Sequence, residues 1–158
     1  MKERIKVEGI EKVKLRKKDP SQQGLEFGRD LNNEEFLGLL DGIGGGLEQR
    51  TIEDRAKRIL TPGVYEGKKA IAEEIIERTD ELENGEQPGI EYYEKGFDIG
   101  RKLSSRNLAS LLEGMSNGLE IKILNNRINT GNDEVDNTIN LRIMMKDWAE
   151  KLKNINYL

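Results

Sequence analysis

The sequence contains neither cysteine nor histidine among its 158 residues. The lack of cysteine excludes disulfide bonds, thiolate nucleophiles and cysteine-ligated zinc. Histidine is the usual general acid or base near neutral pH and the commonest ligand of transition metals, so its absence excludes histidine-based triads and zinc hydrolases. Any enzymatic chemistry would therefore have to use carboxylates, lysine, arginine, serine or tyrosine.

Long apolar runs are also missing. None approaches the ~20 residues that span a bilayer, and the first residues, MKERIKVEG, lack the apolar core of a signal peptide. We therefore expect a soluble protein in the cytoplasm of a host cell, without a membrane partner. Hydrophobic and charged residues each make up 35% of the chain, and the apolar positions are regularly spaced. This composition predicts one globular unit with a charged surface.

Charge is distributed unevenly along the chain, whose net charge is -4. Residues 1–18 hold eight basic and three acidic residues, whereas residues 73–98 hold ten acidic and two basic ones. Apolar and charged residues alternate in the first segment, with Gly9 at the position of a turn. This pattern predicts a basic β-hairpin arm over 1–18, serving either as an edge ribbon or as a contact to phosphate or an acidic partner.

The segment Gly24–Arg55 recurs 72 positions later as Gly96–Arg127, without a gap and with 11 of 32 pairs identical. The two copies read GLEFGRDLNNEEFLGLLDGIGGGLEQRTIEDR and GFDIGRKLSSRNLASLLEGMSNGLEIKILNNR. We interpret this as an internal duplication, with helical repeats over 21–87 and 88–158. What both copies keep is expected to be scaffold, and what only one copy has is where function is expected.

Both copies have the pattern of a helix with one buried face. Apolar residues recur at helical spacing in each copy, and Asn32 and Ser104 occupy equivalent N-cap positions. The apolar positions are Phe36, Leu39, Leu40, Ile43 and Leu47 in the first copy, and Leu108, Leu111, Leu112, Met115 and Leu119 in the second. The predicted fold is mainly α, with duplicated helical units packed in pseudo-twofold symmetry plus the N-terminal β-hairpin.

Paired glycines four residues apart, such as Gly24 and Gly28, predict close helix packing. The glycine-rich segment 42–46 predicts a helix C-cap and turn rather than a phosphate-binding loop, because no Gly-Lys-Ser/Thr follows it. Separate helices would then cover 51–60 and 119–129, the first exposed and the second buried. Long helices are expected over 64–83 and 133–153, with Trp148 in the core. Arg29 and Arg101 are each expected to bridge to a carboxylate or a helix C-terminus within the repeat, with Glu48 and Glu120 as candidates.

Two functional alternatives rest on particular residues. Carboxylates at positions 74, 77, 91 and 94 resemble the ExxE…ExxD pattern of all-α nucleotide pyrophosphohydrolases, which implies Mg²⁺ held between two helices. The departure is Glu94, where that family has Asp. Duplicated helix-turn-helix-like units and the basic arm suggest instead a DNA-binding regulatory protein. Its candidate contacts are Arg50, Arg55, Lys57 and Arg58 in the first copy and Asn125, Asn126, Arg127 and Asn129 in the second.

The acidic stretch favours a third interpretation, a protein that binds another protein's surface and could compete with nucleic acid for a cationic groove. We predict no catalytic residue, metal site or cofactor. The sequence makes no prediction of the oligomeric state. The predicted contact residues are Glu34, Glu35, Glu73, Glu77, Asp80, Glu81, Glu83 and Glu86.

In size, charge and Lys/Glu/Asn/Ile-rich profile the chain resembles the small phage-encoded anti-CRISPR proteins, several of which inhibit single-chain RNA-guided nucleases. The resemblance is one of overall profile, so it transfers no site residue. It implies a non-enzymatic, stoichiometric inhibitor that binds a host effector protein, such as an RNA-guided nuclease, and prevents DNA engagement or cleavage.

Overall fold

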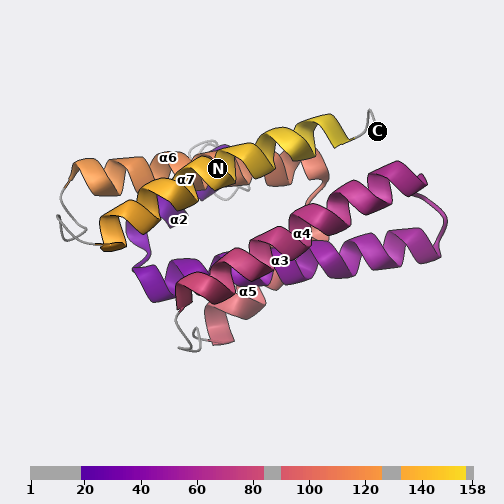
Figure 1. Cartoon of the computed structure of the whole chain (residues 1–158), viewed down its shortest axis with the longest axis horizontal. Helices are drawn as coiled ribbons and strands as arrows, with labels where there is room; N and C mark the ends of the chain where they lie inside the picture. The colour runs from indigo at the N-terminus through magenta and orange to yellow at the C-terminus, as the bar shows by residue number, and fades with distance from the viewer. Residues whose placement is uncertain (1–18, 84–89, 126–132, 156–158) are drawn as a thin grey trace, which may run out of the picture.

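The structure is a computed structural model that describes residues 19–83, 90–125 and 133–155. Within these ranges the chain is mainly α, as the sequence predicts. Its helices are α2 (Pro20–Asp30), α3 (Asn33–Ala56), α4 (Pro62–Glu83), α5 (Ile90–Lys102), α6 (Ser105–Leu124) and α7 (Asp133–Asn154). Helices α3 and α4 pair into one long hairpin, α6 and α7 into another, and the two hairpins lie beside each other (Figure 1). The predicted β-hairpin of residues 1–18 lies outside the described residues.

Helices α3 and α6 begin at the two predicted N-caps. The Asn32 side chain accepts a hydrogen bond of 2.9 Å from the Glu35 amide, and the Glu35 carboxylate accepts one of 3.0 Å from the Asn32 amide. This reciprocal pair is a capping box, which satisfies two free amides at the helix start. In α6 the Ser104 hydroxyl accepts a bond of 3.2 Å from the Asn107 amide. Both predicted caps are confirmed.

The predicted apolar faces form the core. All ten apolar positions of the two matched faces are buried, and α4 adds Ile71, Ala72 and Ile75. In α7 the Met145 and Trp148 side chains have no exposed surface. The predicted core position of Trp148 is therefore confirmed, and Trp148 is the largest fully buried side chain among the described residues.

The glycine-rich segment is not a turn. Helix α3 runs unbroken through residues 42–46, and α6 likewise runs through the matching Gly114 and Gly118. The predicted C-cap and turn are therefore wrong, and residues 51–56 and 119–124 end these long helices rather than forming separate ones. Glycine is about 1 kcal/mol less favourable than alanine inside a helix, but here it permits close contact with a second helix.

These contacts join the two halves of the chain. Helix α2 of the first half packs on α6 of the second, and α5 of the second half packs on α3 of the first. A Cβ at Gly28 would overlap the Met115 carbonyl oxygen, and one at Gly118 would lie 2.7 Å from the Arg29 amide nitrogen. The α3–α5 pair is built in the same way from Gly42, Gly46, Gly96 and Gly100. The predicted close packing at the paired glycines is confirmed.

Three smaller expectations need correction. Arg29 pairs with the adjacent Asp30 at 2.8 Å, and Arg101 pairs with Glu53 at 3.1 Å, so the partners are carboxylates but not the two predicted. The end of α6 is not buried as expected, because Leu124 is 73% exposed. The matching end of α3 is largely exposed as expected, although Thr51 and Asp54 are buried. The Thr51 hydroxyl donates a 2.7 Å hydrogen bond to the Leu47 carbonyl.

Candidate functional site

The predicted acidic contact residues lie mainly along one face of α4. Glu73, Glu77, Asp80 and Glu81 are all exposed and follow one another at helical spacing. We call these four residues the acidic face of α4. Of the other predicted residues, Glu34 is exposed at the start of α3, and Glu86 lies outside the described residues.

Glu35 and Glu83 have structural roles that the sequence did not indicate. Glu35 closes the capping box of α3 and also accepts a hydrogen bond from the Tyr92 hydroxyl, which raises the pKa of Tyr92. Glu83 is partly buried, and its Oε1 atom is inaccessible to solvent without a hydrogen-bond partner. Both residues are therefore less available to a partner than the acidic face itself.

Cations neutralise only part of the acidic face. Glu73 lies 3.9 Å from Lys69, and Glu81 lies 3.1 Å from Arg78, both on α4 itself. Exposed pairs of this kind contribute little stability, about 0–1 kcal/mol, and open readily. Within the described part of the chain, neither Glu77 nor Asp80 forms an ion pair. The face thus presents net negative charge to solvent.

A cluster of three carboxylates, which includes Asp80 of this face, lies where α4 packs on α3. Ligand oxygens of Asp41, Asp80 and Glu83 lie within 4.8 Å of one another. Burial raises the pKa of Glu83 to about 7, and the charges of Asp41 and Asp80 add to the effect. Burial also raises the pKa of Asp41, as does the charge of Asp80, while a hydrogen bond from Thr79 opposes the shift. Near neutral pH, Glu83 is therefore only partly ionised.

The cluster can hold a proton. Among the described residues, it is also the group of acids that could hold a hard cation. It offers three oxygen ligands where Mg²⁺ takes six, so water would have to complete the shell. Sequence reasoning missed Asp41, whose only signal was its alignment with Glu113 in the second copy. The structure does not bring together Glu74, Glu77, Glu91 and Glu94. Glu74 lies 3.9 Å from Lys151 on α7, whereas α5 packs on α3.

The matching surface of the second half has a different charge pattern. Four of the buried positions of α7 (138, 145, 148 and 152) follow four of those of α4 (65, 72, 75 and 79) at a constant offset of 73. This register aligns Asp80 with Lys153 and Glu73 with Lys146. Asp41 aligns with Glu113, which forms an ion pair with Lys153.

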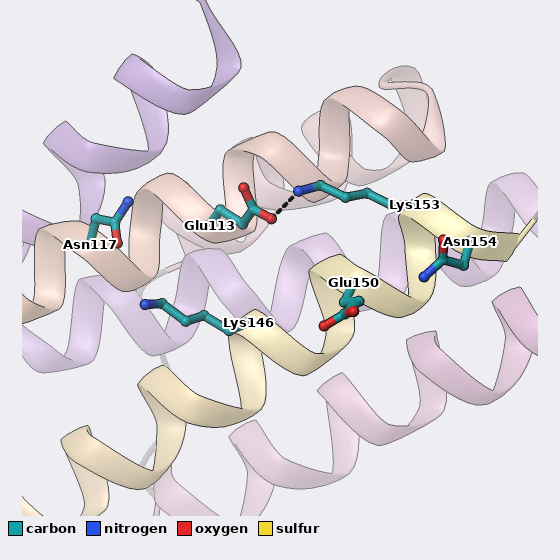
Figure 2. A pocket seen from close by; sticks show the side chains of 6 residues that line it. All are labelled: Glu113, Asn117, Lys146, Glu150, Lys153 and Asn154. Atoms are coloured by element: carbon teal, nitrogen blue, oxygen red, sulfur yellow. Dashed lines mark hydrogen bonds and ion pairs between the residues drawn. The ribbon is translucent and has the colours of Figure 1, made fainter.

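A polar pocket of about 470 Å³ occupies this part of the second half. Figure 2 shows Glu113 and Asn117 on α6, and Lys146, Glu150, Lys153 and Asn154 on α7, with Lys153 turned toward Glu113. Here two lysines offset two glutamates. The first half carries acids at both of the corresponding lysine positions, so the excess negative charge is specific to the first half.

The basic residues proposed for DNA contact are partly engaged within the protein. Arg50 lies 3.0 Å from Asp54 and donates a 2.8 Å hydrogen bond to the Arg101 carbonyl. The Arg55 guanidinium stacks over the Tyr65 ring at 4.3 Å. Lys57 and Arg58 are exposed at the end of α3. In the second copy Asn125 is exposed, and the other three candidates lie outside the described residues.

No family model matches the sequence, and no curated protein or solved structure matches it either. Among the described residues, no helix is both long and apolar enough to cross a bilayer.

Proposed function

We propose that this chain is a non-enzymatic, phage-derived inhibitor that binds a host effector protein and occupies its nucleic-acid-binding surface. The acidic face of α4, together with the exposed Glu34 at the start of α3, is the proposed contact surface. The observation that supports this proposal is the net negative charge of that face, where Glu77 and Asp80 form no ion pair within the described residues. Carboxylates without internal cations are free to pair with lysines and arginines of a partner, which accelerates encounter and selects a cationic surface.

The difference between the two halves supports the same residues. Packing constrains α4 and α7 alike, because both bury one face against a neighbouring long helix. Packing does not require that the solvent-facing positions 73 and 80 be acidic, since α7 has lysine at both corresponding positions. We propose that the two halves arose by duplication, are related by pseudo-twofold symmetry, and diverged at this surface for partner binding.

A cleavage assay tests the proposal. The protein is titrated into DNA-cleavage reactions with a panel of single-chain RNA-guided nucleases, and inhibition should be complete near a 1:1 ratio for at least one of them. The variant Glu77→Lys/Asp80→Lys/Glu81→Lys should bind that nuclease at least tenfold more weakly with unchanged helicity. Its control is Glu91→Lys/Glu94→Lys/Glu150→Lys, which changes net charge equally at exposed positions outside the acidic face.

The two variants separate a specific contact from a general charge effect. Equal loss of inhibition in both would show that net charge alone matters and would contradict the assignment of the surface. Absence of inhibition across the panel would contradict the choice of RNA-guided nucleases as the effector.

DNA binding is the second candidate, favoured by the exposed Lys57 and Arg58 at the end of α3. A gel-shift titration with duplex DNA at low and moderate salt distinguishes it from protein binding. Direct binding through phosphate contacts should weaken steeply with salt, and the variant Lys57→Gln/Arg58→Gln should then lose it. No shift at either salt concentration would exclude this candidate.

A further inference from the structure

Each half of the chain is structurally incomplete without the other. Within the first half, α3 and α4 form a hairpin, but α2 packs on α6 of the second half. Within the second half, α6 and α7 form a hairpin, but α5 packs on α3 of the first half. The helix pairs α2–α6, α3–α5 and α4–α7 therefore all cross between halves.

In the two glycine-lined pairs, both helices contribute glycines to the contact between halves. At the α2–α6 interface, Gly24 and Gly28 approach the α6 backbone, and Gly114 and Gly118 approach the α2 backbone. At the α3–α5 interface, Gly42 and Gly46 approach the α5 backbone, and Gly96 and Gly100 approach the α3 backbone. Each half thus carries one short glycine-faced helix and one long glycine-faced helix, and the complementary half carries the partner of each.

We propose that a second copy of this chain is a binding partner, through exchange of complete halves. The first half of one molecule then packs on the second half of the other, and the reverse, which gives a closed dimer with two copies of every crossing interface. A single connection, between Glu83 and Ile90, links the halves within each chain. Exchange keeps all described contacts, because every one of them lies within a half or between complementary halves.

The protein concentration during folding determines whether the monomer or the exchanged dimer forms. A short connection gives the halves of one chain an effective concentration on the order of 1 mM for each other, which favours the monomer in dilute solution. Refolding at about 1 mM protein should therefore produce exchanged dimer alongside monomer. The dimer should persist on dilution, because reverting requires both glycine interfaces to open.

A complementation experiment with full-length chains tests the exchange. One variant carries Gly28→Leu, which disrupts the α2–α6 interface, and the other carries Gly100→Leu, which disrupts α3–α5. Each variant alone should melt well below the wild type or fail to fold. The two variants are unfolded and refolded together at high concentration. In the exchanged dimer, each folded unit consists of the first half of one chain and the second half of the other. One unit then carries both mutations, and the other has a fully wild-type set of interfaces. The mixture should yield a dimer that contains both variants and shows a wild-type melting transition.

The control pair places both mutations in the first half. Exchange between Gly28→Leu and Gly42→Leu leaves each unit with one disrupted interface, so no wild-type transition should appear. Light scattering coupled to size exclusion gives the mass, and native mass spectrometry identifies the two variants. The proposal is overturned if the first mixture shows no wild-type transition in a dimer, or if the control mixture shows the same recovery.

Discussion

The substitution Gly42→Ala tests the close helix packing most directly. Gly42 is buried on α3, and a Cβ there would overlap the Tyr93 carbonyl oxygen and lie 2.8 Å from the Phe97 amide nitrogen. Ordinary Cβ contacts lie at 3.4–4 Å, and the obstructing atoms belong to the backbone of α5. Because a backbone cannot rotate away as a side chain can, α5 must shift as a whole by roughly 1 Å.

The magnitude follows from the four glycines that share this interface. Close Cα–H···O contacts of this kind contribute about 0.5–1 kcal/mol each, so separating the helices forfeits about 2–4 kcal/mol. Replacing glycine by alanine inside a helix returns about 1 kcal/mol of helix propensity. We therefore expect Gly42→Ala to lower the free energy of unfolding by about 1–3 kcal/mol.

Gly45→Ala is the matched control on the same helix. A Cβ at Gly45 would meet the Tyr93 hydroxyl at 2.8 Å, which is the movable end of a side chain, and Phe97 Cδ2 at 3.4 Å. The gain in helix propensity is the same, so the difference between the two variants isolates the packing contribution. Thermal melts followed by circular dichroism should separate them by roughly 4–16 °C, at about 2–4 °C per kcal/mol for a chain of this size. Equal melting temperatures would refute the close-packing argument.

Three further predictions concern stability and burial. Glu83→Gln should stabilise the protein at pH 8 by about 1–2 kcal/mol, allowing for partial solvent access, because the raised pKa of Glu83 means that the native state prefers its protonated form. The stability that protonated Glu83 contributes is fully present below about pH 4.5 and is lost as pH rises through about 7, so the gain from Glu83→Gln should appear only at the higher pH. Urea midpoints at pH 5 and pH 8 check this, with exposed Glu81→Gln as control, and a Glu83→Gln effect that does not depend on pH would contradict it. Asn32→Ala and Ser104→Ala should each destabilise the protein by about 1 kcal/mol, measured by the same midpoints, because each removes an N-cap; no change in either would show that the caps contribute nothing. Trp148, the single tryptophan, should emit at short wavelength and resist acrylamide until unfolding, since its side chain is fully buried; ready quenching of the native protein would place it at the surface.

The sequence predicts the features of the fold that depend on neighbouring residues. The N-caps at Asn32 and Ser104 and the apolar faces of the helices follow from spacing within a few turns, and the structure confirms them. The role of Gly42 depends on α5, about 50 residues further along the chain, and nothing in its own neighbourhood distinguishes a turn glycine from a packing glycine. The crossing of α2 and α5 between halves is likewise invisible to local pattern.

In the candidate surface, too, the residues of one helix could be predicted from the sequence, and those brought together by helix packing could not. The acidic face of α4 is a periodic feature of one helix, so the sequence identifies Glu73, Glu77, Asp80 and Glu81 together. The carboxylate cluster requires Asp41, which is 39 positions before Asp80 and carries no motif. Its proximity results from the packing of α3 on α4, and only the structure reveals that Glu83 turns toward it.

The crossing of short helices between halves also determines when the protein can fold during synthesis. As the nascent chain leaves the ribosome, the α3–α4 hairpin emerges before α5, so the glycine face of α3 has no partner until α5 follows. Helix α2, the earliest described helix, lacks its partner for longer still, because its contacts on α6 extend to Leu119. The apolar faces of the first half therefore stay uncovered through much of translation, and we expect the nascent chain to engage chaperones until the second half emerges.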